Sequence, residues 1–163
     1  MTFSEPLLAK ARSALDAARG ARLRIATAES CTGGLVIACL TEIAGSSDVV
    51  ERGFVTYSNE AKTAMLGVPA TLIRSHGAVS EPVARAMAEG ALAQAPADLA
   101  VSITGIAGPG GATPSKPVGL VHLAVARRGR PTRHERHVFS GDRAAIREAA
   151  VARALDLLAT AAQ

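Results

Sequence analysis

Hydrophobic residues follow two periods along the chain, and these periods predict where helices and strands lie. In residues 4–19 and again after Ser140, apolar side chains recur three or four positions apart, as one buried face of a helix requires. Residues 99–105 are a mostly apolar run and residues 132–140 alternate, as strands do. With the turn and capping residues, these patterns predict helices over 4–19, 32–45, 59–66, 81–95 and from Ser140 onward, and strands over 22–28, 49–58, 99–105, 120–126 and 132–140.

Serine residues indicate where four of these helices begin. Ser4, Ser58, Ser80 and Ser140 are the expected N-caps, because a hydroxyl oxygen can accept a hydrogen bond from a free amide of the first turn. The predicted strands alternate with helices, and the last two form a hairpin. This order predicts an α/β fold in which residues 1–163 form a single domain, a three-layer α/β/α sandwich with a mixed, mostly parallel sheet.

The positive net charge permits nucleic acid, a membrane surface or an anionic small molecule as partner, but the composition gives little support for nucleic acid. Apolar residues make up 48% of the 163 residues but aromatic residues only 2%, so few side chains are available to stack on bases. The net charge of +4 is modest, and the densest basic stretch, residues 126–137, surrounds a Gly-Arg-Pro turn. We interpret that stretch as a solvated hairpin tip and expect no nucleic-acid partner.

The cysteines and the hydropathy pattern suggest a cytoplasmic protein. Cys31 and Cys39 are predicted to lie on one helix, about 12 Å apart, which is too far for a disulfide bond, so both should be free thiols. The sequence has neither a secretory pattern at its start nor an apolar run of about 18 residues. We therefore expect a cytoplasmic location and no membrane partner.

The sequence AESCTGG, residues 28–34, is the first candidate site. It joins a predicted strand to a predicted helix, where open α/β sheets form their sites. Ser30 and Cys31 are both candidate nucleophiles, and the hydrophobic pattern does not choose between them. The backbone amides of Cys31, Thr32, Gly33 and Gly34 are candidates for an oxyanion hole or a phosphate site. A turn that uses small residues for structural reasons alone is the alternative.

A serine nucleophile needs a base, and the sequence favours lysine over histidine in that role. The four histidines lie away from the predicted strand ends, in a loop (His76), in mid-strand (His122) and on an edge strand (His134 and His137). A buried lysine can lose its proton, whereas an arginine cannot. Lys62 follows the only tyrosine, Tyr57, by five positions. A half-buried Tyr57 and a solvated Lys62 without catalytic roles are the alternative.

A second glycine-rich junction, TGIAGPGG at residues 104–111, follows another predicted strand. It matches neither a P-loop nor a dinucleotide-binding fingerprint, so Thr104, Gly105 and Gly108 are candidates for a general ligand loop or for a tight structural turn. Arg143 lies in the first turn of the last predicted helix, where the helix dipole disfavours a cation. A bound anion would explain that position, and simple solvation of the side chain is the alternative.

Five segments of the chain closely resemble the CinA C-terminal domain family of nicotinamide-nucleotide amidohydrolases, in order and with the expected spacing. They are TAESCTGGLVIACLTEIAGSSDVVERGFVTYSNEAKTAMLGV, HGAVSEPVARAMAEGA, TGIAGPGG, KPVGLVHLAVA and FSGDRAAIR, and the resemblance runs from about residue 5 to residue 160. It implies the stand-alone form of the domain. It also implies deamidation of nicotinamide mononucleotide to nicotinate mononucleotide and ammonia, with no metal and no other cofactor.

The resemblance also implies roles for individual residues. Carried over by motif, the nucleophile is Ser30, and the supporting pair is Tyr57 and Lys62. Arg143 and the amides of residues 104–111 are our candidates for holding the phosphate of the substrate. A homodimer is the expected assembly. Related domains can lack deamidase activity, so a non-catalytic nucleotide- or phosphate-binding module of the same fold remains the alternative function.

Overall fold

The computed structural model describes residues 3–163. The helices are α1 (Glu5–Gly20), α2 (Leu35–Thr41), α3 (Asn59–Leu66), α4 (Ala70–His76), α5 (Glu81–Gln94) and α6 (Arg143–Ala162), with a short 3₁₀ helix, η1, at Ser46–Asp48. The strands are β1 (Ile25–Glu29), β2 (Val50–Val55), β3 (Leu99–Gly105), β4 (Leu120–Arg127) and β5 (Arg133–Val138). Over these residues no helix is both long and apolar enough to cross a membrane.

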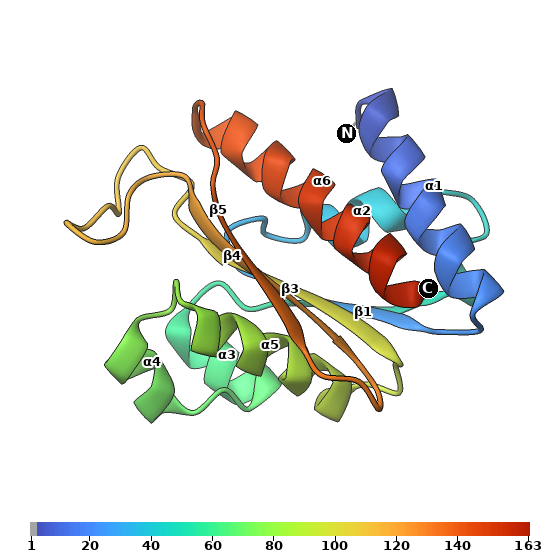
Figure 1. Ribbon diagram of the computed structural model, residues 1–163, viewed down its shortest axis with the longest axis horizontal. Helices are drawn as coiled ribbons and strands as arrows, with labels where there is room; N and C mark the ends of the chain where they lie inside the picture. The colour runs from blue at the N-terminus through green and yellow to red at the C-terminus, as the bar shows by residue number, and fades with distance from the viewer. Residues whose placement is uncertain (1–2) are drawn as a thin grey trace.

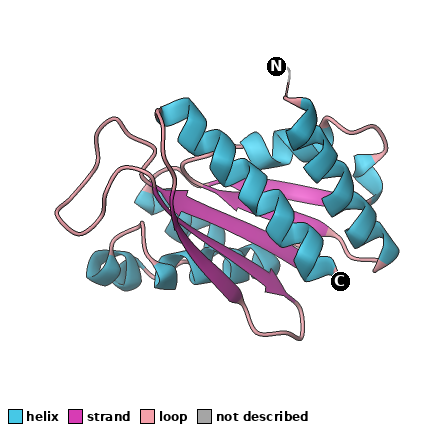
Figure 2. Cartoon of the chain, turned by 45° about the horizontal axis from the view of Figure 1, so that its top comes forward, coloured by secondary structure: helices cyan, strands magenta, loops and turns pink. Residues whose placement is uncertain are grey.

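The five strands form one sheet in the order β2-β1-β3-β4-β5. β1 pairs in parallel with β2 and β3, whereas β4 is antiparallel to both of its neighbours, so four strands run one way and β4 runs against them. Helices α1, α2 and α6 cover one face of the sheet, and α3, α4 and α5 cover the other (Figures 1 and 2). The predicted three-layer α/β sandwich with a mixed, mostly parallel sheet is confirmed.

The two faces of the sheet are packed with side chains of different size. Towards α1 and α6 the strands contribute mainly valine, leucine and isoleucine. Towards α5 they contribute mainly alanine, including Ala28, Ala100 and Ala124. Small side chains let α5 approach closely, and the hydroxyl of Ser102 in β3 donates to the carbonyl of Ala84 in α5 over 2.6 Å. This contact fixes α5, and the segment leading into it, against the sheet.

The start of α2 differs from the prediction. The helix expected over residues 32–45 begins only at Leu35, after a turn in which Gly33 and Gly34 have φ angles of +59° and +97°. Glycine adopts such angles without steric cost. Residues 31–34 therefore form a non-helical turn, and α2 begins after it. Cys31 consequently lies in the turn and not in the helix, although Cys31 and Cys39 are both free, as predicted.

Other helix starts were predicted with mixed success. Ser58 caps α3 as expected, because its Oγ accepts from the amide of Ala61. Ser4 and Ser80 precede α1 and α5 but make no side-chain cap hydrogen bond. The N-cap of α6 is Asp142, not Ser140. Helix α4 was not predicted, so its last residue, His76, lies at a helix end and not in a loop.

The basic stretch around the β4–β5 turn has a structural use. Arg127 donates from Nη1 to the carbonyl of Ala161, near the end of α6, over 2.8 Å. Arg128 donates from Nη2 to the carbonyls of Leu92 and Ala95, at the end of α5, over 2.6 and 3.1 Å. Guanidinium groups at helix C-termini satisfy free carbonyls and are favoured by the helix dipole. Two of these arginines therefore hold helix ends.

Candidate active site

The candidate residues converge at the carboxyl ends of three adjacent strands that run in the same direction. Ser30 follows β1, Thr104 and Gly105 end β3, and Tyr57 lies just beyond β2. A cavity of about 210 Å³ opens there, and the predicted residues that line it are Ser30, Cys31, Tyr57, Lys62, Thr104, Gly105 and Arg143. Thr32, Gly33, Gly34 and Gly108 do not line it. This position agrees with the rule that sites in open α/β sheets form beyond the carboxyl ends of strands.

Lys62 reaches Ser30 from the first turn of α3. Its Nζ lies 3.0 Å from Oγ of Ser30, 2.9 Å from the carbonyl oxygen of Thr56 and 3.3 Å from that of Tyr57. The side chain is only 1% exposed. Burial lowers the pKa of Lys62, and the nearby Cys31 opposes that shift. A buried amine with a lowered pKa, in contact with a hydroxyl, is the arrangement that activates a serine.

Tyr57 borders the cavity with its ring in solvent. The residue is 65% exposed, and its carbonyl oxygen contacts Lys62. Its hydroxyl makes no hydrogen bond within residues 3–163. The geometry therefore favours direct proton transfer between Ser30 and Lys62 over a relay through the tyrosine hydroxyl, and leaves the ring free to cover a bound ligand.

Glu29 organises the turn after Ser30, and the sequence analysis missed it. The side chain is fully buried. Its carboxylate accepts hydrogen bonds from the hydroxyl of Thr32 and from the amides of Gly34, Val36 and Ile37, at 2.7 to 3.1 Å. These are the amides that a helix start leaves without partners, and the helix dipole favours a carboxylate there. The available signal was an acidic residue at the end of a buried strand, directly before a glycine turn.

The same hydrogen bonds limit which amides of the turn can bind a ligand. The amide of Gly34 donates to Glu29, and the amide of Gly33 donates to the carbonyl of Ser30 over 3.0 Å. The prediction that these two amides face a ligand is therefore wrong. The amides of Cys31 and Thr32 have no acceptor among the described residues. Thr32 is fully buried and does not line the cavity, so the prediction that its amide faces a ligand is also wrong, and the amide of Cys31 remains the candidate oxyanion donor.

The environment of Cys31 separates the two candidate nucleophiles. Burial, assisted by the charge of Glu29, raises the pKa of the Cys31 thiol to about 11. The thiolate is the reactive form of cysteine, and a raised pKa keeps the thiol protonated near neutral pH. Ser30, in contact with a candidate base, is therefore the better candidate for the nucleophile.

The second glycine-rich junction forms the opposite wall of the cavity. The hydroxyl of Thr104 donates to the carbonyl of Ala78 over 2.9 Å, and Nη1 of Arg143 donates to the carbonyl of Gly108 over 2.9 Å. Gly108 has a φ of +77°, and a Cβ built on it would lie 2.6 Å from Cγ1 of Val118. Gly108 therefore has a structural role, while the side chain of Arg143 still borders the cavity.

None of the histidines in the described chain lines this cavity. Nδ1 of His122 and Nε2 of His134 are 2.8 Å apart, between β4 and β5. Burial, with the charge of His134 as the next cause, lowers the pKa of His122 to about 4. Residues 3–163 also contain no cluster of three or more His, Cys, Asp or Glu side chains arranged to hold a metal ion.

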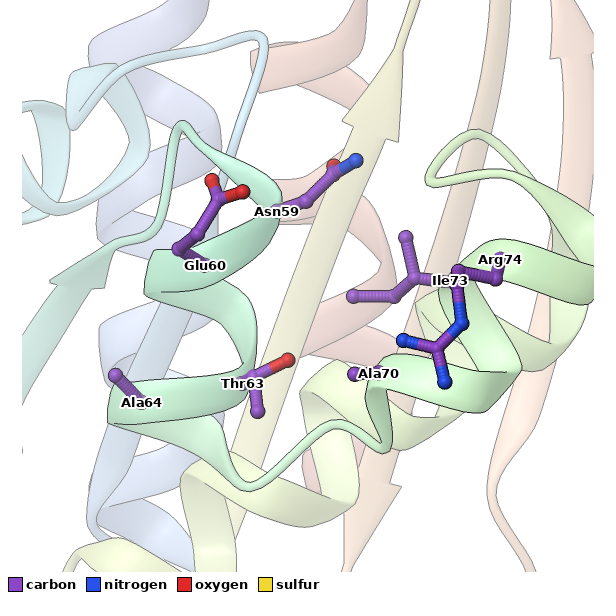
Figure 3. Close-up of a pocket in the computed structure, with 7 residues that line it drawn as sticks. All are labelled: Asn59, Glu60, Thr63, Ala64, Ala70, Ile73 and Arg74. Carbon is purple, nitrogen blue, oxygen red and sulfur yellow. The ribbon is translucent and has the colours of Figure 1, made fainter.

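A second, larger hollow lies between α3 and α4 (Figure 3). Its volume is about 470 Å³, and it is lined by Asn59, Glu60, Thr63, Ala64, Ala70, Ile73 and Arg74. Asn59 also lines the Ser30 cavity, so the two hollows adjoin. The side chains in Figure 3 do not pair a nucleophile with a base, and we place the chemistry in the smaller cavity.

Comparison with known proteins finds relatives over almost the whole chain. The model of the CinA C-terminal domain matches residues 8–162. A putative competence-damage inducible protein of Symbiobacterium thermophilum is 52% identical over 162 residues, which cover 94% of this chain and 38% of that protein. A CinA-like protein of Mycolicibacterium vanbaalenii is 58% identical over 134 residues, covering 82% and 32%. The chain spans about a third of the length of these curated relatives.

Solved structures extend the likeness to three dimensions. The competence/damage inducible protein CihA of Agrobacterium tumefaciens is 47% identical with a TM-score of 0.97, over 100% of this chain and 99% of that one. A CinA superfamily protein of Escherichia coli is 32% identical with a TM-score of 0.91, over 98% and 94%. The names of these proteins state no chemical activity.

Proposed function

Because this chain belongs to the CinA C-terminal domain family, we propose that it is a serine amidohydrolase that deamidates nicotinamide mononucleotide. The observation that carries the proposal is the 3.0 Å contact between Nζ of the buried Lys62 and Oγ of Ser30. Support for the substrate comes from Ser30, Tyr57 and Lys62, which occupy the motif positions of the amidohydrolases that the sequence resembles.

The hydrogen bonds of Lys62 are compatible with a neutral amine. A neutral amine has two N–H groups and one lone pair. The carbonyls of Thr56 and Tyr57 can accept the two N–H groups, and the lone pair then faces the hydroxyl of Ser30. The lowered pKa of Lys62 favours this protonation state. Lys62 can therefore accept the Ser30 proton without an intermediary.

The reaction then proceeds in two half-reactions. Oγ of Ser30 attacks the carboxamide carbon and its proton passes to Lys62, while the amide of Cys31 stabilises the oxyanion. The Lys62 ammonium protonates the departing nitrogen, the C–N bond breaks and ammonia leaves an acyl-enzyme. Lys62 next takes a proton from water, the resulting attack releases nicotinate mononucleotide, and the proton returns to Ser30.

The cavity and its charge suggest how the substrate lies. A volume of about 210 Å³ is smaller than that of usual small-molecule pockets, about 300 to 1,000 Å³, so only part of a mononucleotide would be enclosed. We place the pyridine ring against Ser30 and the phosphate at the mouth, beside the exposed Arg143. One N–H of Arg143 binds Gly108, and the others remain to bind phosphate oxygens.

The test is an ammonia assay on nicotinamide mononucleotide with wild type, Ser30→Ala and Cys31→Ala. We expect release by wild type and Cys31→Ala and none by Ser30→Ala. Wild-type turnover by Ser30→Ala would exclude the mechanism. Tight binding of the mononucleotide by wild type, measured by calorimetry, with no ammonia over hours, would instead favour a non-catalytic binding module.

A further inference from the structure

Two arginines of α6, one turn apart, each hold one of the two glycine-rich junctions. Arg143 binds the second junction at Gly108. Arg147 binds the first: its Nε donates to the carbonyl of Cys31 over 3.1 Å and its Nη2 to the carbonyl of Thr32 over 3.2 Å. Arg147 does not line the Ser30 cavity, so it is not placed to touch the substrate.

The planar peptide bond gives this clamp a consequence for the amides. In a trans peptide the C=O and the following N–H point in opposite directions. A carbonyl of Cys31 held towards Arg147 therefore turns the amide of Thr32 away from α6. In the same way, the carbonyl of Ser30, which accepts from the amide of Gly33, sets the direction of the Cys31 amide. The candidate oxyanion donor, the Cys31 amide, and the buried Thr32 amide next to it are thus both oriented through the carbonyl on the other side of their peptide plane.

We propose that Arg147 is a positioning residue that holds the Cys31–Thr32 peptide, and with it the turn that bears Ser30 and the Cys31 amide, for oxyanion stabilisation. This inference rests on the proposed serine mechanism. The guanidinium is suited to the task because its N–H groups are rigidly spaced and here meet two successive carbonyls, whereas a lysine would offer one mobile ammonium. Loss of Arg147 frees the Cys31–Thr32 peptide to rotate and leaves the pair of Ser30 and Lys62 in place.

The experiment measures how fast Ser30 reacts with a small fluorophosphonate. Oγ of Ser30 attacks phosphorus, fluoride leaves, the serine proton passes to Lys62, and the adduct is counted by mass spectrometry. This reaction needs the nucleophile, the base and the oxyanion donor, but not the natural substrate. The variants are Arg147→Ala and Arg147→Lys. The matched control is Arg153→Ala on the same helix, because Arg153 binds the carboxylate of Glu135 and not the turn.

We expect Arg147→Ala to slow labelling of Ser30 by about 10- to 100-fold, Arg147→Lys to slow it less, and Arg153→Ala to label at the wild-type rate. Millimolar methylguanidinium should restore part of the rate to Arg147→Ala and leave wild type unchanged. With nicotinamide mononucleotide, kcat should fall while KM stays near the wild-type value. Circular dichroism on each variant confirms that the labelled protein is folded.

The outcomes distinguish a failure of this inference from a failure of the proposed function. The inference is overturned if Ser30 of folded Arg147→Ala is labelled as fast as Ser30 of wild type. It is also overturned if Arg153→Ala lowers the labelling rate as much as Arg147→Ala does. If wild type labels at Ser30 but releases no ammonia from the mononucleotide, the proposed substrate is wrong while the comparison of labelling rates still decides the role of Arg147. If wild type does not label, both the serine mechanism and the inference fail.

Discussion

The two glycine-rich junctions, residues 29–34 after β1 and residues 104–111 after β3, are built alike but differ in their internal charge. Both follow neighbouring parallel strands, and an arginine of α6 holds a carbonyl in each. In the first junction, the carboxylate of Glu29 binds the amides of Gly34, Val36 and Ile37. In the second, no carboxylate within residues 3–163 accepts a backbone amide.

This difference indicates which of the two junctions is suited to bind a phosphate. With Glu29 in place, the start of α2 already has its negative charge and its amides already have acceptors, so a phosphate would meet repulsion there. In the proposed mechanism the first junction instead holds the nucleophile, Ser30. The second junction keeps a cation, Arg143, at the cavity without an internal anion, and we propose that the phosphate binds on that side.

Replacing Lys62 should give the largest effect, because the proposed mechanism then loses the base that contacts Ser30 of the first junction. We expect Lys62→Arg and Lys62→Met to lower kcat by about 10²- to 10⁴-fold, since arginine keeps its proton and methionine cannot accept one. Arg143→Gln, at the second junction, should mainly raise KM for the mononucleotide. Ordinary turnover by Lys62→Arg would exclude Lys62 as the base.

Lys62 should also make folding stability depend on pH. Its pKa in the fold lies below the 10.5 of a free lysine side chain, so between these two values the unfolded chain binds a proton that the folded chain lacks. The free energy of unfolding therefore rises with pH across that window. Lys62→Met lacks this dependence, and its stability advantage over wild type should be largest below the folded pKa and shrink towards pH 10.5. Thermal unfolding at several pH values measures the difference, and an advantage that grows with pH would contradict it.

Removing the internal charge of the first junction should cost more stability than removing a polar contact of the second. We expect Glu29→Gln to lower the free energy of unfolding by about 3 kcal/mol, because an amide cannot accept all the hydrogen bonds that the buried carboxylate accepts. Thr104→Val, which loses one hydrogen bond to Ala78, should lower it by about 1 kcal/mol. Urea denaturation compares the two. Equal losses would mean that the carboxylate does not organise its junction.

Alanine substitutions should reverse that order, since the second junction is more tightly packed around its glycine. Gly33→Ala puts a side chain at a φ of +59° with its nearest neighbour 3.6 Å away, and should cost about 1 kcal/mol. Gly108→Ala adds a contact of 2.6 Å with Val118 to a similar backbone strain, and should cost about 3 kcal/mol. Thermal unfolding of the two variants side by side measures the order.

The smallest effect should come from the thiol beside the nucleophile. Cys31→Ala keeps the backbone amide that the mechanism needs and loses only a protonated thiol, so kcat should change by no more than about twofold. The ammonia assay measures it. A loss as large as that of Lys62→Arg would return Cys31 to the list of nucleophiles.

Periodic segments could be predicted well from the sequence. The mostly apolar run of residues 99–105 coincides with β3, and residues 59–66 with α3, where Ser58 forms the predicted cap. Prediction failed where competing local signals had similar strength. At the last helix Ser140 and Asp142 are both good caps, and it is the carboxylate of Asp142 that accepts from the amide of Ala145. Helix α4 has only seven residues, too few to show a clear period.

The candidate site, like the fold, could be predicted from the sequence only in part. The order of residues specified a serine at a strand end, a glycine turn and one lysine close to the only tyrosine. The family resemblance then assigned the serine, the tyrosine and the lysine to one site. The fold alone determined that Lys62 is buried against Ser30, that Glu29 occupies the turn amides and that Arg147, 116 positions from Cys31, holds the same turn. The reason is physical: a lysine loses its proton, and an amide is left free, only through burial and through partners that are distant in sequence.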